Sequence, residues 1–114
     1  MLLVESWRTL NTHTLRTRDG ALLQDEVQAI QLGEDVALVT LPHEVFVELG
    51  LEIKRRSPYR QTLVLSLAND IDFYVPTRKA FGEGSYEVTT SSYQPGGGEW
   101  LVEGAVQLLH ELKR

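Results

Sequence analysis

The sequence predicts an α+β domain of an α/β-like kind: a β-hairpin leads into a right-handed βαβ unit, and a C-terminal helix packs on a small mixed sheet. Three observations predict this. Two apolar runs flank a short glycine-containing turn, a stretch of helical period separates the second run from a third, and another helical stretch closes the chain. With 114 residues, the chain has the length of a single domain, 1–114.

Residues 1–24 follow no steady period, so we predict a poorly defined, extended N-terminal arm there. The hairpin follows, with strands over 27–32 and 36–41 around the turn Gly33-Glu34-Asp35. The second strand is apolar on both faces, which is typical of a central strand.

A helix is predicted over 43–56, because Pro42 suits a first helical position and Val45, Leu49 and Ile53 recur at helical spacing. A buried strand over 62–67 comes next. The two strands and the helix form a βαβ unit with parallel strands. The loops that follow both strands then meet at one edge of the sheet, which is the usual place for a ligand.

The rest of the chain is predicted to hold smaller elements and one long helix. Thr77 suits the N-cap of a short helix over 78–83, and 86–90 has the composition of a short strand. A loop over 91–98 contains Pro95-Gly96-Gly97-Gly98. The last helix, over 99–112, is expected to bury a face made of Leu101, Ala105, Leu108 and Leu112.

Charge and composition exclude several classes of function. The 16 acidic residues outweigh the 11 basic ones, so the chain lacks the basic stripe that nucleic-acid binding needs. There is no cysteine, which excludes thiol catalysis, disulfides and cysteine-based zinc sites. No apolar run approaches the roughly 18 residues of a transmembrane segment, and the first residues do not form a signal peptide. The compartment stays unknown.

Two residues are brought to the same crevice by the predicted βαβ geometry. Glu44 in a first helical turn is either a carboxylate that complements the helix dipole or a metal ligand or general base. Tyr74, in the loop after the third strand, is either an amphipathic surface residue or a phenol that contacts a metal or an oxyanion. Of the three histidines, His43 is the best candidate ligand because it lies beside Glu44.

The polar loop before Thr77 offers further candidates. Asn69, Asp72 and Thr77 are predicted substrate-binding residues. Asp70 and Asp72 also suit a solvated turn, since an Asp-x-Asp pair falls far short of a calcium loop. The glycine run before the last helix is either an anion cradle or, as we prefer, a flexible loop.

Several of these segments together resemble the C-terminal part of the catalytic domain of the neutral/alkaline (non-lysosomal) ceramidase family, above all the ceramidase-like proteins of environmental bacteria. The resemblance covers about residues 25–113 and depends on Leu41-Pro42-His43-Glu44, on Asn69, on Tyr74-Val75-Pro76-Thr77-Arg78, on Tyr86-Glu87 and on Gly97-Gly98-Glu99. Enzymes of this family are zinc amidases that cleave the N-acyl bond of ceramide. The resemblance implies that Glu44 corresponds to the family's glutamate zinc ligand and Tyr74 to the tyrosine beside the zinc.

The sequence also departs from the family pattern. The family's two histidine ligands come from an N-terminal region that has no counterpart here, and His43 replaces the glycine of the usual Leu-Pro-Gly-Glu motif. The resemblance therefore implies a zinc site that is incomplete in this chain, since a catalytic zinc takes about three protein ligands.

Three hypotheses follow for the function. The first is a ceramidase-like domain fragment that is inactive alone and lacks the hydrolase half with the histidines. The second is a metal-dependent hydrolase completed by self-association, as a homo-oligomer, or by a partner chain. The third is a non-enzymatic binding or assembly module, whose exposed apolar surface invites partners.

Overall fold

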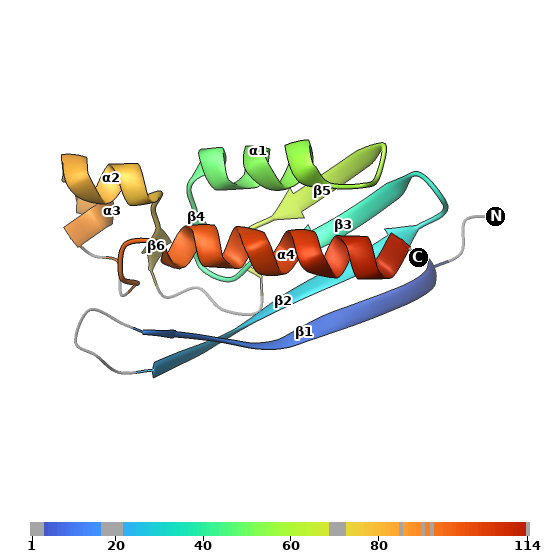
Figure 1. The fold of residues 1–114 in the computed structure, drawn as a ribbon, viewed down its shortest axis with the longest axis horizontal. Coiled ribbons are helices and arrows are strands. Elements are labelled where there is room, and N and C mark those ends of the chain that lie inside the picture. Colours follow the sequence, from blue (N-terminus) through green and yellow to red (C-terminus); the bar gives the residue numbers. More distant parts are fainter. Residues whose placement is uncertain are drawn as a thin grey trace.

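The computed structural model describes residues 4–16, 22–68, 73–84, 86–89, 91 and 93–113. Figure 1 shows the arrangement of the elements in space. In chain order, these elements are β1 (Val4–Arg16), β2 (Leu22–Leu32), β3 (Val36–Thr40), β4 (Glu44–Val45), α1 (Val47–Arg56), β5 (Gln61–Leu65), β6 (Tyr74–Val75), α2 (Arg78–Glu83), α3 (Tyr86–Thr89) and α4 (Gly97–Lys113).

The main sheet has the strand order β1-β2-β3-β5. Strands β1, β2 and β3 pair in antiparallel fashion, and β5 pairs with β3 in parallel. The predicted hairpin is therefore confirmed as β2–β3, with Gly33 at φ 72° in its turn. The parallel β3–α1–β5 unit is confirmed too, because α1 connects two parallel strands that lie side by side.

The N-terminal arm that we predicted is extended, but where the structure describes it, over 4–16, it is not a loose arm. It forms β1, which pairs with β2 along nearly its whole length. The register between the two strands shifts between Leu10 and His13. Such an irregularity interrupts the regular strand register, and this explains why no steady strand period is visible in the sequence of this segment.

Helices α1 and α4 cover one face of the main sheet (Figure 1). Helix α4 contacts β1 and β2, α1 contacts β5, and the two helices contact each other. The predicted buried face of the last helix is confirmed, since Leu101, Ala105, Leu108 and Leu112 are all buried. They join a core that also contains Val27, Ala29, Ala37, Val39, Leu49 and Ile53.

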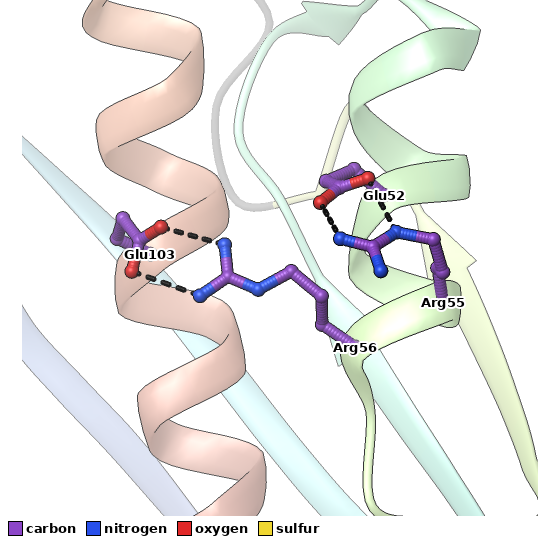
Figure 2. Close-up of polar contacts among 4 residues, drawn as sticks. All are labelled: Glu52, Arg55, Arg56 and Glu103. Atoms are coloured by element: carbon purple, nitrogen blue, oxygen red, sulfur yellow. Dashed lines mark hydrogen bonds and ion pairs between the residues drawn. The ribbon is translucent and has the colours of Figure 1, made fainter.

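Helices α1 and α4 carry two ion pairs on their exposed surfaces (Figure 2). The guanidinium of Arg56, at the end of α1, donates to both carboxylate oxygens of Glu103 on α4 at 2.6 and 3.1 Å. Within α1, Arg55 donates to Glu52. Both arginines at the end of α1 thus pair with carboxylates, and Arg56 ties the two helices together. In the part of the chain that the structure describes, no helix has the length and apolarity to cross a membrane.

The predicted start of the helix over 43–56 was wrong. The helix begins at Val47, and Glu44–Val45 form the short strand β4 instead. The reason is a long-range partner: β4 pairs in parallel with β6 to make a separate two-stranded sheet. The backbone N–H of Phe46 donates to the carbonyl of Val75 at 3.0 Å, which keeps the residue before the helix extended.

The segment between β6 and α4 holds one confirmed and one wrong prediction. Thr77 caps α2 as expected, because its hydroxyl accepts the N–H of Ala80 at 3.0 Å. The strand predicted over 86–90 does not form where the structure describes this range, because Tyr86–Thr89 form the short helix α3. Its residue types favour strands, but α3 packs beside β6 and no strand of the described chain pairs with it.

The glycine run is not the flexible loop that we expected. Gly97 and Gly98 are buried and open α4. A Cβ atom on Gly98 would lie 2.5 Å from Leu49 Cδ1 and 2.8 Å from the carbonyl oxygen of Pro76. These distances are too short for any side chain, so Gly98 allows α4 to lie close to α1 and to the end of β6.

Candidate functional site

Glu44 and Tyr74 lie directly opposite each other. They are register partners in the parallel pair β4–β6. The N–H of Glu44 donates to the carbonyl of Phe73 at 2.9 Å, which fixes the two backbones against each other. Cross-strand neighbours in a sheet have their Cβ atoms close together on one face, so the pairing brings the carboxylate and the phenol to the same place.

The pair lies on the wall of a shallow groove with a volume of about 250 Å³. Glu44 is exposed and Tyr74 is half-buried, and the ring of Tyr86 meets the ring of Tyr74 edge-on with centroids 6.3 Å apart. The lining combines apolar and acidic side chains. Its residues are Glu44, Val45, Phe46, Val47, Glu48, Tyr74 and Glu87.

The electrostatics of the groove act on the phenol. The negative charge of Glu44 raises the pKa of Tyr74 above its usual value near 10.0, and partial desolvation, a hydrogen bond to Glu44 and the charge of Glu87 act in the same direction. The phenol therefore stays protonated through the neutral range and is a hydrogen-bond donor there. Glu44 is the acceptor beside it.

The structure does not bring His43 to this groove. Its imidazole is fully buried, and its Nε2 lies 2.9 Å from the carboxylate oxygen Oδ1 of Asp25. The ring stacks on Phe73. His43 has φ 61°, the left-handed conformation in which glycine is the usual residue. A glycine at this position could adopt the same backbone without strain.

Of the predicted substrate-binding residues, the structure describes only Thr77. The hydroxyl of Thr77 is engaged in the N-cap of α2, and the residue lines a second groove between α1 and α4 rather than the one beside Glu44. Asn69, Asp70 and Asp72 lie outside the described residues.

Sequence reasoning missed two polar residues close to the site, Asp25 and Tyr93. The hydroxyl of Tyr93 donates to Oδ2 of Asp25, whose Oδ1 contacts His43, and all three residues are buried. A signal for Asp25 existed in the alternation of β2, because Asp25 shares the buried face with Val27 and Ala29. A charged residue in such a row indicates a buried partner.

The donor set can be compared with the needs of a catalytic zinc. Zinc takes about three protein ligands, drawn from histidine, cysteine and carboxylates. Glu44 and Tyr74 supply one carboxylate and one phenol, and within the described ranges no group of three histidine, cysteine, aspartate or glutamate side chains could hold a metal ion. The described residues therefore do not fit a zinc site by themselves.

Comparison with known proteins gives a result at the level of structure only. The sequence matches no protein-family model and no curated protein. The structure is similar to the crystal structure of neutral ceramidase from Pseudomonas aeruginosa, with a TM-score of 0.71 and 22% identity over 88% of this chain and 16% of that one. It is also similar to a ceramidase complexed with C2, with a TM-score of 0.71 and 20% identity over 86% of this chain and 18% of the other.

The chain thus spans less than a fifth of the length of either ceramidase chain. At this level of sequence identity, the structural similarity establishes a shared fold. The expected resemblance is confirmed at that level, and the chain has a ceramidase-like fold.

Proposed function

We propose that this chain is a ceramidase-like domain fragment that carries the Glu44–Tyr74 part of an amide-hydrolase site and is inactive alone. The observation that carries the proposal is the direct pairing of Glu44 with Tyr74 on a groove wall. The ceramidase-like fold is consistent with it, and the sequence resemblance implies that these same two residues belong to the zinc end of the site. The zinc itself would need histidines that come from elsewhere.

The groove has the chemistry that an N-acylated lipid needs. Val45, Phe46 and Val47 offer an apolar wall for an uncharged hydrocarbon chain. The protonated phenol of Tyr74 can donate a hydrogen bond to an amide carbonyl, and such a donor becomes more effective when that oxygen gains negative charge. Glu44 accepts this single phenolic proton in the free chain, so the hydroxyl would turn from Glu44 to the carbonyl when a substrate binds.

The test measures metal binding and amide hydrolysis on the purified chain. We expect far less than one zinc ion per chain and no release of fatty acid from a short-chain ceramide. Added Zn²⁺ should bind weakly, shift the amide resonances of Glu44 and Tyr74, and lose this effect in Glu44→Gln. The control Glu52→Gln, which changes a carboxylate on α1 outside this groove, should leave the shifts unchanged.

Tightly bound stoichiometric zinc would overturn the proposal. If hydrolysis accompanied that zinc and both were lost in Glu44→Gln, the chain would be a complete hydrolase, assembled by self-association or with a partner. Zinc shifts that persist in Glu44→Gln would place the metal elsewhere and would also count against the proposal.

A different observation favours a second function, assembly with another copy of the chain. Helices α1 and α4 cover one face of the main sheet, and the opposite face, which we call the open face, carries an apolar row. Ile30, Leu38 and Leu63 are consecutive register partners there, and Leu63 and Leu65 are 41% and 48% exposed. Over 28–32, 36–40 and 61–65, no residue on this face is charged.

A second copy is the occupant that we propose for the open face. The chain has a net charge of −5, so two copies repel each other wherever their charged surfaces meet. An uncharged apolar face is the surface on which two identical copies can pack with the least repulsion, and a two-fold axis makes such a face complementary to itself.

Light scattering coupled to size exclusion tests this. We expect a dimer for the unmodified chain and a monomer for Leu63→Lys combined with Leu65→Lys. The control Leu51→Lys, at a residue of α1 that is 56% exposed, should remain a dimer. A monomeric unmodified chain, or dissociation by the control alone, would contradict assembly through the open face.

A further inference from the structure

A buried network of three polar side chains lies next to the Glu44–Tyr74 pair. It joins Asp25 of β2, His43 of the loop after β3 and Tyr93, which precedes α4. The Asp25 carboxylate uses one oxygen for His43 and the other for Tyr93. His43 and Tyr93 are fully buried and Asp25 is 4% exposed. The network therefore connects three distant parts of the chain inside the core.

Such a network has to be nearly complete to be tolerated. A carboxylate removed from water is strongly destabilising unless both oxygens find donors. Here both do, and the two donors come from groups that are themselves held by aromatic packing. A fully satisfied buried network favours one arrangement of the segments that it joins.

The network reaches the groove through two adjacent rings. The imidazole of His43 stacks on the ring of Phe73 with centroids 3.9 Å apart and an interplanar angle of 20°. Phe73 also meets the ring of Tyr93 edge-on at 5.0 Å. His43 directly precedes Glu44, and Phe73 directly precedes Tyr74. Each residue of the pair thus follows a residue that the network holds.

Strands β4 and β6 need such an anchor. Each is two residues long, and two strands of that length are not stable on their own. His43 is also held at φ 61°, a conformation that a side chain adopts only when its surroundings impose it. The link between the network and the two strands accounts for both features.

We infer that Asp25, His43 and Tyr93 are positioning residues that hold Glu44 and Tyr74 in register across the groove. The inference deepens the proposed function and rests on it for the importance of the pair. The geometry itself can be tested without metal or substrate, so its failure and that of the proposed function are separate results.

The experiment is amide hydrogen exchange, followed by NMR, on the full chain and on Tyr93→Phe, which removes only the hydroxyl that reaches Asp25. We expect exchange at the Glu44 and Phe46 amides, which donate to Phe73 and Val75, to accelerate by about tenfold or more. Amides of the β2–β3 ladder should change much less.

The control is Tyr59→Phe. Tyr59 is also buried, and its hydroxyl donates to Gln31 at 2.6 Å, outside the network. This variant should not accelerate Glu44 and Phe46 beyond the rest of the chain. Uniform acceleration in Tyr93→Phe, or none at Glu44 and Phe46, would overturn the inference.

A second variant keeps the test decisive if Tyr93→Phe does not fold. Phe73→Leu retains an apolar side chain but removes the ring that His43 stacks on. It should accelerate the same two amides selectively. The same acceleration in all amides would show that the stack only fills the core, and would overturn the inference.

Discussion

His43 stacks on Phe73 with ring centroids 3.9 Å apart, and each of these residues directly precedes one member of the Glu44–Tyr74 pair. One ring of this contact belongs to a residue in a left-handed conformation, and the other belongs to the residue before a two-residue strand. The stacked rings in the core are therefore only one residue away from the Glu44–Tyr74 pair at the surface.

Replacing Glu44 by Gln should lower the pKa of Tyr74 toward its usual value, because the negative charge that opposes the phenolate is removed. Titration by tyrosinate absorbance, with Tyr74→Phe as the reference for subtraction, measures the change. Glu48→Gln removes another carboxylate of the same groove and should leave the pKa of Tyr74 unchanged. An unchanged pKa in Glu44→Gln would mean that the two side chains do not interact in solution.

The same interaction sets a dependence of stability on pH. The pKa of Tyr74 is higher in the folded chain than its ordinary value of 10.0, so its contribution to stability is complete below about pH 10 and is lost as the pH rises through the folded pKa. The difference in stability between the unmodified chain and Glu44→Gln, measured by chemical denaturation, should therefore stay constant from neutral pH to about pH 10 and change above pH 10.

Replacing Gly98 by Ala should destabilise the fold by about 1–3 kcal/mol, because the added methyl group overlaps Leu49 and the carbonyl of Pro76. Gly82, in α2, provides the matched control, since a Cβ atom added there would have no neighbouring atom within 4 Å. Gly82→Ala should be neutral or stabilise by up to about 1 kcal/mol, since alanine favours helices. Chemical denaturation gives both values, and equal effects would contradict the close approach at Gly98.

Leu67 offers a stabilising substitution. It has φ 57° and is 49% exposed. A leucine is strained in this left-handed conformation, and its side chain gains little from burial because about half of it is in contact with solvent. Leu67→Asn should stabilise by about 1 kcal/mol, because asparagine tolerates this conformation. Leu65 is equally exposed, at 48%, but lies in β5, where asparagine is disfavoured. Leu65→Asn should therefore destabilise, and thermal unfolding of the two variants compares them directly.

The bridge between α1 and α4 predicts a response to acid. The hydrogen bonds from Arg56 hold the pKa of Glu103 below its usual 4.5. A lowered folded pKa contributes stability above the unfolded pKa, and this contribution is lost as the pH falls through the folded value. A double-mutant cycle with Arg56→Gln and Glu103→Gln should give a favourable coupling at about pH 7 that is lost as the pH falls through the lowered pKa of Glu103. The coupling will be small, because the pair is solvent-exposed.

The parts of the fold that repeat regularly were predictable from the sequence. The β2–β3 hairpin, the parallel β3–β5 pair and the buried face of α4 each extend over enough residues for a period to emerge. Strands β4 and β6 could not be predicted, because a two-residue strand has no period and its partner is about thirty positions away in the chain. For the same reason, the start of α1 was placed too early.

Of the candidate site, the Glu44–Tyr74 pair could be predicted from the sequence, and the buried network behind it could not. Parallel strands place the loops that follow them at one edge, and this argument was enough to bring Glu44 and Tyr74 together. The pair in fact meets in a separate small sheet. The contact between Asp25 and Tyr93 spans 68 positions, and nothing local in the sequence links the two residues. His43 was a candidate ligand because of its neighbour, whereas in the structure its ring lies in the core.

The left-handed backbone at residue 43 has a consequence for the engineering of the loop that carries Glu44. A glycine at this position needs no partner, whereas His43 is accommodated together with Asp25 and Tyr93. Replacing His43 alone by Gly would relieve the backbone but would leave the buried carboxylate of Asp25 without one of its partners. A change at residue 43 therefore has to be made together with changes at positions 25 and 93, although these positions are far apart in the sequence.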